Sequence, residues 1–141
     1  MLQRPHPASR PLHVLVATPA GATGQGGIDR LMASLRAELE RQSGLGIDVR
    51  FVATRGTGSV LLSPLYTLGF LGRMVGRRLT GRLDLVHLNV SSSGSTFRKL
   101  IIAASARTLG VPYVVHVHGA GYRDFWSDRR PLVSRLIRLM F

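Results

Sequence analysis

The chain alternates short apolar runs with longer segments whose apolar residues recur at helical spacing, and this alternation constrains its fold more than any other feature. The apolar runs lie at residues 12–17, 47–54, 83–90 and 111–118. Short runs rich in β-branched residues are typical of strands buried in a parallel sheet. Helical spacing is found at residues 28–42, 60–79, 96–110 and 131–141. Strands that alternate with helices predict parallel pairing through right-handed crossovers.

The predicted fold class is therefore α/β: a Rossmann-like parallel sheet with helices on both faces. Residues 12–141 form its single domain, and residues 1–11, with three prolines and little apolar content, form a flexible tail. Four strands are few for a doubly wound sheet, and the last predicted helix reaches Phe141 on apolar residues without a cap. We therefore expect the domain to be incomplete.

Residues 60–79 are the most apolar stretch of the chain. Pro64 and three glycines interrupt the stretch, and Arg73 ends its uncharged run. A membrane-spanning helix needs about 20 mostly apolar residues, so this segment predicts a helix broken near Pro64. Residues 119–130 predict a long loop.

The chain carries a formal net charge of +12 and no cysteine. The charge favours an anionic partner, such as a nucleic acid, an anionic lipid or a phosphorylated substrate. However, 18 of the 19 basic residues are arginine and only Lys99 is lysine, a bias that also follows from genome base composition. The lack of cysteine excludes disulfides and thiolate metal sites. No long apolar stretch follows the N-terminus, so we expect a cytoplasmic protein.

Ligands of open parallel sheets bind at the carboxyl ends of the strands. The loops at those ends are residues 19–27, 54–59, 90–95 and 118–126. In the first loop Gly24, Gly26 and Gly27 lie between a strand and a helix, where backbone N–H groups and the helix dipole favour a phosphate.

His116 and His118 are two residues apart on the fourth predicted strand and therefore share a face. No third metal ligand is evident, so we expect no metal site. His118 stands at the carboxyl end of the strand and is the candidate site residue, whereas His116 fits a core histidine better. In the loop that follows, Asp124 is a candidate for proton transfer or for an ion pair with Arg123, Arg129 or Arg130. Phe125 and Trp126 either contact an acceptor or anchor that loop.

Three segments together resemble the N-terminal domain of family-4-like retaining glycosyltransferases of the GT-B fold. The first is HVLVATPAGATGQGGIDRLMASLRAEL, and the second is DLVHLNVSSSGSTFRKLIIAASARTLGVPYVVHVHGAGYRDFW. The third is the basic helix that begins at Arg130. The resemblance spans residues 12–141, through the order and spacing of the motifs.

The resemblance implies transfer of a sugar from a nucleotide diphospho-sugar to a glycan or lipid-linked acceptor, with retention and without a metal or other cofactor. It implies that Gly24, Gly26 and Gly27 approach the donor diphosphate and that His118 is the catalytic residue. We assign acceptor binding to Ser91, Ser92 and Asp124.

The resemblance also implies that basic, apolar helices dock such enzymes on membranes. Residues 60–82, with Arg73, Arg77 and Arg78, suit peripheral contact with the inner face of a membrane. The donor-binding domain with its paired glutamates is not in the sequence, so we expect the chain to be a fragment that is inactive alone.

Two alternatives remain open at this stage. The pattern Gly21-x-x-Gly24-x-Gly26 faintly resembles the turn of short-chain NAD(P)-dependent oxidoreductases, and Arg55 would favour a 2′-phosphate. The Tyr-x-x-x-Lys pair of those enzymes is missing, because Ser95 stands four residues before Lys99. The other alternative is a non-enzymatic basic module that binds anionic membrane or nucleic acid. The aromatic residues are few and not interleaved with the arginines, so we expect no nucleic-acid partner.

Overall fold

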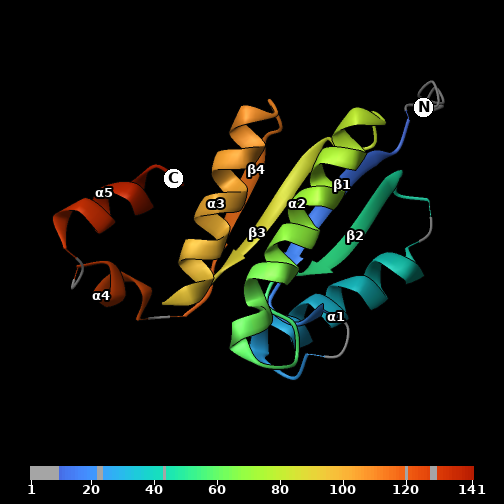
Figure 1. The fold of residues 1–141 in the computed structure, drawn as a ribbon. Coiled ribbons are helices and arrows are strands. Elements are labelled where there is room, and N and C mark those ends of the chain that lie inside the picture. Colours follow the sequence, from blue (N-terminus) through green and yellow to red (C-terminus); the bar gives the residue numbers. More distant parts are fainter. Residues whose placement is uncertain (1–9, 22–23, 43, 120, 128–129) are drawn as a thin grey trace, which may run out of the picture.

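The computed structural model describes residues 10–21, 24–42, 44–119, 121–127 and 130–141. Strands and helices alternate along the chain (Figure 1), as the sequence pattern predicts. In chain order the elements are β1 (Leu12–Thr18), α1 (Gly27–Arg41), β2 (Ile47–Ala53), η2 (Val60–Leu62), α2 (Ser63–Leu79), β3 (Leu85–Val90), α3 (Gly94–Thr108), β4 (Tyr113–Val117), α4 (Tyr122–Ser127) and α5 (Pro131–Arg138). Most of the predicted tail lies outside the described residues.

The four strands form one parallel sheet in the order β2-β1-β3-β4. Strand β1 is central: Val14 pairs with Val49 of β2 on one side and with Leu85 of β3 on the other. Strand β4 is an edge, with Tyr113 opposite Val86 of β3. A parallel sheet brings the carboxyl ends of all its strands to one edge, which positions the loops considered below.

The larger core lies between the sheet and the two helices α2 and α3, which run side by side in front of it in Figure 1. Alternate residues of β1 and β3 supply the sheet side of this core, as the period of two in a strand requires. The buried residues on the helix side are Phe70, Met74, Ile102, Ala103 and Ala106. Complete burial of a side chain as large as Phe, Met or Ile stabilises the fold by about 1.5–3 kcal/mol.

Helix α1 covers the opposite face of the sheet, where Met32 packs against Val14 and Val16. Helices therefore lie on both faces, and the predicted Rossmann-like α/β class is confirmed. On the α1 side the covering is partial, because Val114 and His116 of β4 are exposed. The interpretation of His116 as a core histidine is wrong for this reason: no described helix packs over that part of the edge strand.

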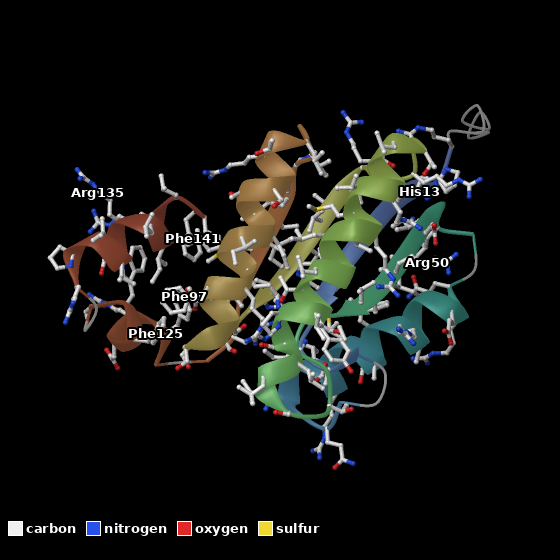
Figure 2. All side chains as sticks on the ribbon, viewed as in Figure 1. His13, Arg50, Phe97, Phe125, Arg135 and Phe141 are labelled. Carbon is white, nitrogen blue, oxygen red and sulfur yellow. The ribbon has the colours of Figure 1, made fainter. Side chains whose placement is uncertain are left out.

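The predicted loop over residues 119–130 is wrong in part, because it contains helix α4. Aromatic packing explains this helix. Tyr122 is buried, its ring lies 5.7 Å from that of Phe125, and Trp126 stacks on Phe141 at 5.9 Å. Figure 2 places Phe97, Phe125 and Phe141 together where α3 meets α4 and α5. The aromatic residues thus anchor this segment to the body of the domain.

The apolar stretch at residues 60–79 forms η2 followed by α2, with Pro64 in the first turn of α2. Proline is tolerated there because the first N–H groups of a helix lack partners. Among the described residues, none of the helices has the length and apolar character needed to cross a membrane.

Candidate functional site

The glycine-rich loop after β1 forms one wall of an open groove at the carboxyl edge of the sheet. The groove has a volume of about 450 Å³, and its lining includes Gly24, Gly26, Gly27, Arg55 and Thr57. Gly26 is the N-cap of α1 and has no side chain that could cap the helix. The first N–H groups of a helix have no partner within it, so they are available to an anion.

Asp29, in the first turn of α1, holds the shape of this loop. Its carboxylate is nearly fully buried and accepts a hydrogen bond from the N–H of Ala20 at 3.1 Å. A Cβ atom on Gly24 would lie 2.3 Å from the Asp29 carboxyl carbon. Glycine at position 24 therefore lets the buried carboxylate pack directly against the loop backbone.

His118, the predicted catalytic residue, lies just beyond β4 and is held by Asn89 of β3. The Nε2 atom of His118 is 2.8 Å from Oδ1 of Asn89. Asn89 is fully buried, and its Nδ2 donates to the carbonyl oxygen of Ala17 at 3.3 Å. Because the amide oxygen can only accept, Nε2 of His118 carries the proton and Nδ1 of the neutral ring is left as an acceptor.

His118 belongs to a row of three imidazoles on one face of β3 and β4. The ring of His116 lies 4.1 Å from that of His118 and 5.7 Å from that of His87. Burial lowers the pKa of His118, and the neighbouring His116 lowers it further. Burial and the other two histidines lower the pKa of His87 in the same way. Within the described residues, no three His, Asp or Glu side chains are arranged to hold a metal ion.

Lys99 is a buried cation behind this edge of the sheet. It lies on α3 with 0% of its surface exposed, and its Nζ atom donates to Oγ1 of Thr54 at 2.6 Å. Thr54 in turn donates to the carbonyl oxygen of Thr18 at 2.9 Å, and Thr67 of α2 donates to the carbonyl of Thr54. Burial lowers the pKa of Lys99 to about 7, with Arg98 lowering and Asp29 raising it.

The residues assigned to acceptor binding lie in two segments, the turn after β3 and helix α4. Ser91 is half-buried and Ser92 is exposed in the turn after β3. The carbonyl of Ser91 accepts a hydrogen bond from Thr96 at 2.8 Å. Asp124 is exposed on α4, and none of the ion pairs in the described part of the chain includes it. Its suggested partner Arg129 lies outside the described residues.

The three arginines assigned to membrane docking lie on α2, away from the groove. Arg77 is half-buried and pairs with Asp48 at 3.0 Å. Arg78 donates from Nε to the carbonyl of Leu109 at 3.0 Å, and Arg73 donates to the carbonyl of Gly69 at 3.2 Å. Asp48 also contacts His13, which Figure 2 shows with Arg50 at the end of the sheet remote from α4 and α5.

Sequence reasoning missed two residues of this site, Asn89 and Lys99. Lys99 stands three, four and seven residues before Ile102, Ala103 and Ala106, which are all buried on α3. A lysine on an apolar helical face was therefore a usable signal. Asn89 interrupts an apolar strand, but which residue its amide would meet depends on the pairing of β3 with β4.

The fold and the edge together define a Rossmann-like α/β domain of the kind that forms the N-terminal half of GT-B glycosyltransferases. The family model of the glycosyl transferase 4-like domain matches residues 8–141, and the chain belongs to this family. No curated protein and no solved structure matches it. This family, with no Tyr-x-x-x-Lys pair in the sequence, decides against the short-chain oxidoreductase alternative.

Proposed function

We propose that the protein to which this domain belongs transfers a sugar from a nucleotide diphospho-sugar to a hydroxyl group of a glycan or lipid-linked acceptor, with retention at the anomeric carbon. The observation that carries the proposal is the hydrogen-bonded link from His118 through Asn89 to Ala17. This link joins the end of β4 to the end of β1, two residues before the glycine-rich loop begins. The link therefore holds His118 and the start of the glycine-rich loop, to which the proposal assigns the sugar and the diphosphate, at one edge of the sheet.

The proposed roles follow from the chemistry of these groups. Backbone N–H groups at Gly26 and Gly27 stabilise the charge that develops on the leaving diphosphate. Nδ1 of His118 accepts a hydrogen bond from a sugar or acceptor hydroxyl group at the reacting centre. Ser91, Ser92 and Asp124 contact the acceptor from the loops after β3 and β4. The reaction needs no metal and no cofactor beyond the donor substrate.

The donor-binding half of the site belongs to a second domain with paired glutamates. Sequencing the DNA downstream of the Phe141 codon tests this first. A reading frame that continues into such a domain supports the proposal. A stop codon there, with no second half encoded nearby, contradicts it.

Activity provides the direct test. With that second domain present, wild-type protein should release nucleotide diphosphate from one member of a panel of nucleotide diphospho-sugars when an acceptor extract is added. The His118→Ala variant should be slower by about 100-fold, the scale on which positioned polar groups act. Equal rates for the two proteins would show that the role of His118 is wrong.

We further propose peripheral contact with an anionic membrane through α2. The apolar residues Leu61, Leu65, Leu68, Val75 and Leu79, with Gly72, recur at intervals of three and four residues. The five side chains are all exposed, from 40% for Val75 to 87% for Leu61. Leu61 lies in η2, and the other four side chains lie on α2 beside its arginines. Exposed apolar residues beside basic residues on one helix are typical of a helix that lies on a lipid surface.

A further inference from the structure

Three cations gather where the end of β2 meets α3. The hydrogen bond from Lys99 to Thr54 fixes this meeting, with the two atoms 2.6 Å apart. Arg55 follows Thr54 in the chain and Arg98 precedes Lys99, and the charges of Arg55 and Arg98 act on each other. The burial of the three differs: Arg55 is exposed, Arg98 is half-buried and Lys99 is fully buried.

These cations lack compensating negative charge. None of the ion pairs among the described residues includes Arg55, Arg98 or Lys99. The Nε atom of Arg98 is buried and has no hydrogen-bond partner in that part of the chain. The carboxylate of Asp29 raises the pKa of Lys99, and it also accepts a hydrogen bond from the N–H of Ala20.

Burying a cation away from water without a negative charge beside it costs free energy. The cost lowers the pKa of the group, because the neutral form becomes more favourable. Burial lowers the pKa of Arg98, and the charge of Arg55 lowers it further. The pKa of Lys99 falls to about 7 for the same first reason. A bound anion would reverse these shifts because it would supply the missing charge.

The cluster adjoins the groove of the glycine-rich loop. Arg55 lines that groove together with Gly26 and Gly27, which offer the N–H groups of the α1 terminus. Guanidinium groups bind phosphate oxygens through parallel, charge-assisted hydrogen bonds. A dianionic phosphoryl group therefore matches both the charge and the donors present at this position.

We propose that Arg55 and Arg98, with Lys99 behind them as a buried charge, form a binding site for a phosphoryl group of a substrate. The source of that group rests on the proposed function: it is either the diphosphate of the sugar nucleotide or the phosphate of a phosphorylated acceptor. The shared chemistry of the two sources makes inorganic pyrophosphate a suitable first probe.

Titration calorimetry of the 141-residue chain with pyrophosphate tests the site. Arg98→Gln should weaken binding by about tenfold or more, as expected when a hydrogen bond to a charged group is lost. Lys99→Met should also weaken binding, because it removes a buried positive charge near the anion. Arg135→Gln is the matched control, because Arg135 points away from the body of the molecule on α5 (Figure 2). Circular dichroism of each variant verifies that it folds. Unchanged affinity in folded Arg98→Gln would overturn the proposal.

A second measurement separates a buried charge from a packing role for Lys99. Sulfate keeps its charge between about pH 5 and pH 9, so changes in its affinity report on the protein. The groups facing Lys99 are Thr54, Asp29 and Arg98. Sulfate affinity should fall as the pH rises through about 7 in the wild type, and Lys99→Met should remove this fall. An identical pH profile in both proteins would overturn the role of Lys99.

The same titrations identify the source of the phosphoryl group. Binding of UDP or GDP that depends on Arg98 assigns the site to the donor, whereas binding of farnesyl diphosphate that depends on Arg98 assigns it to the acceptor. If neither depends on Arg98, the site is not a substrate site and the proposal fails. A loss of transfer in His118→Ala bears only on the proposed function, because His118 is outside the cluster.

Discussion

Oδ1 of Asn89 lies 2.8 Å from Nε2 of His118, so an amide buried in β3 decides which nitrogen of the imidazole carries the proton. Nδ2 of the same amide is 3.3 Å from the carbonyl oxygen of Ala17, which prevents the amide from turning over without losing that bond. His118 therefore presents one defined tautomer at the edge of the sheet.

Asn89→Asp should raise the pKa of His118 above its wild-type value. A carboxylate in place of the amide favours the protonated imidazole, because an opposite charge at hydrogen-bond distance stabilises the charged form. Proton NMR titration of the Cε1–H resonance of His118 measures the change. The resonance of His13, at the other end of the sheet, is the internal control. If His118 titrates as in the wild type, the hydrogen bond to residue 89 is absent in solution.

The lowered pKa values of His87 and His118 predict a loss of stability in mild acid. The unfolded chain binds protons at these histidines below about pH 6.5, while the folded protein resists protonation. The free energy of unfolding should therefore fall as the pH drops from about 6.5 towards 5. Urea unfolding at several pH values measures this, and the double variant His87→Gln, His118→Gln should show a smaller fall. The lowered pKa values of Asp48 and Asp84 change the free energy of unfolding only below about pH 4.

The lowered pKa of Lys99 predicts how the stability of the fold changes with pH above about 7. The pKa of Lys99 is about 7 in the folded protein, whereas its ordinary value is 10.5. Between these two values the unfolded chain therefore holds a proton that the folded protein has released. Wild-type stability should rise with pH from about 7 to 10, whereas Lys99→Met should lack this rise. The difference in urea midpoint between the two proteins measures the effect. A constant difference across this range would show that Lys99 is solvated.

Gly24 and Gly27 should respond differently to alanine. In Gly24→Ala the new Cβ meets the buried Asp29 carboxylate, which is expected to cost about 1–3 kcal/mol as for other overpacked sites. At Gly27 nothing lies within 4 Å of the added Cβ, so Gly27→Ala should change the free energy of unfolding by less than about 0.5 kcal/mol. Chemical unfolding of both variants distinguishes the two. Equal stability would mean that Asp29 does not pack on the loop.

The apolar stripe on α2 predicts binding to vesicles. Leu65→Glu, Leu68→Glu should weaken sedimentation with phosphatidylglycerol vesicles by about tenfold or more, because apolar area is lost and negative charge is added. Leu132→Glu, Leu136→Glu on α5 is the matched control, since both leucines are also exposed. If the two double variants bind alike, the stripe does not contact lipid.

Sequence periodicity predicted the sheet and its helices because each apolar residue faces a core that its own element helps to build. Leu15 and Ala17 on one face of β1, and Val14 and Val16 on the other, are all buried by this rule. Helix α4 escaped prediction because its aromatic side chains pack on residues distant in the chain: Tyr122 joins the main core, and Phe141 from beyond α5 packs on Tyr122 and Trp126.

The candidate site was only partly predictable. The position of His118 followed from strand direction alone, since the carboxyl end of a parallel strand is its functional end. The partner of His118 did not, because Asn89 reaches it only through the pairing of β3 with the edge strand. The exposure of His116 was also not predictable from the sequence, because it depends on which part of the sheet α1 leaves uncovered.

The burial of Lys99 also makes the chain a reporter of its own opening. Lys99 is the only lysine, so an amine-reactive reagent has two targets, the α-amino group and a side chain that solvent does not reach in the folded state. Acylation of Lys99 then requires α3 to separate from the end of β2. Its rate, read by mass spectrometry, measures the free energy of that local opening without any introduced label.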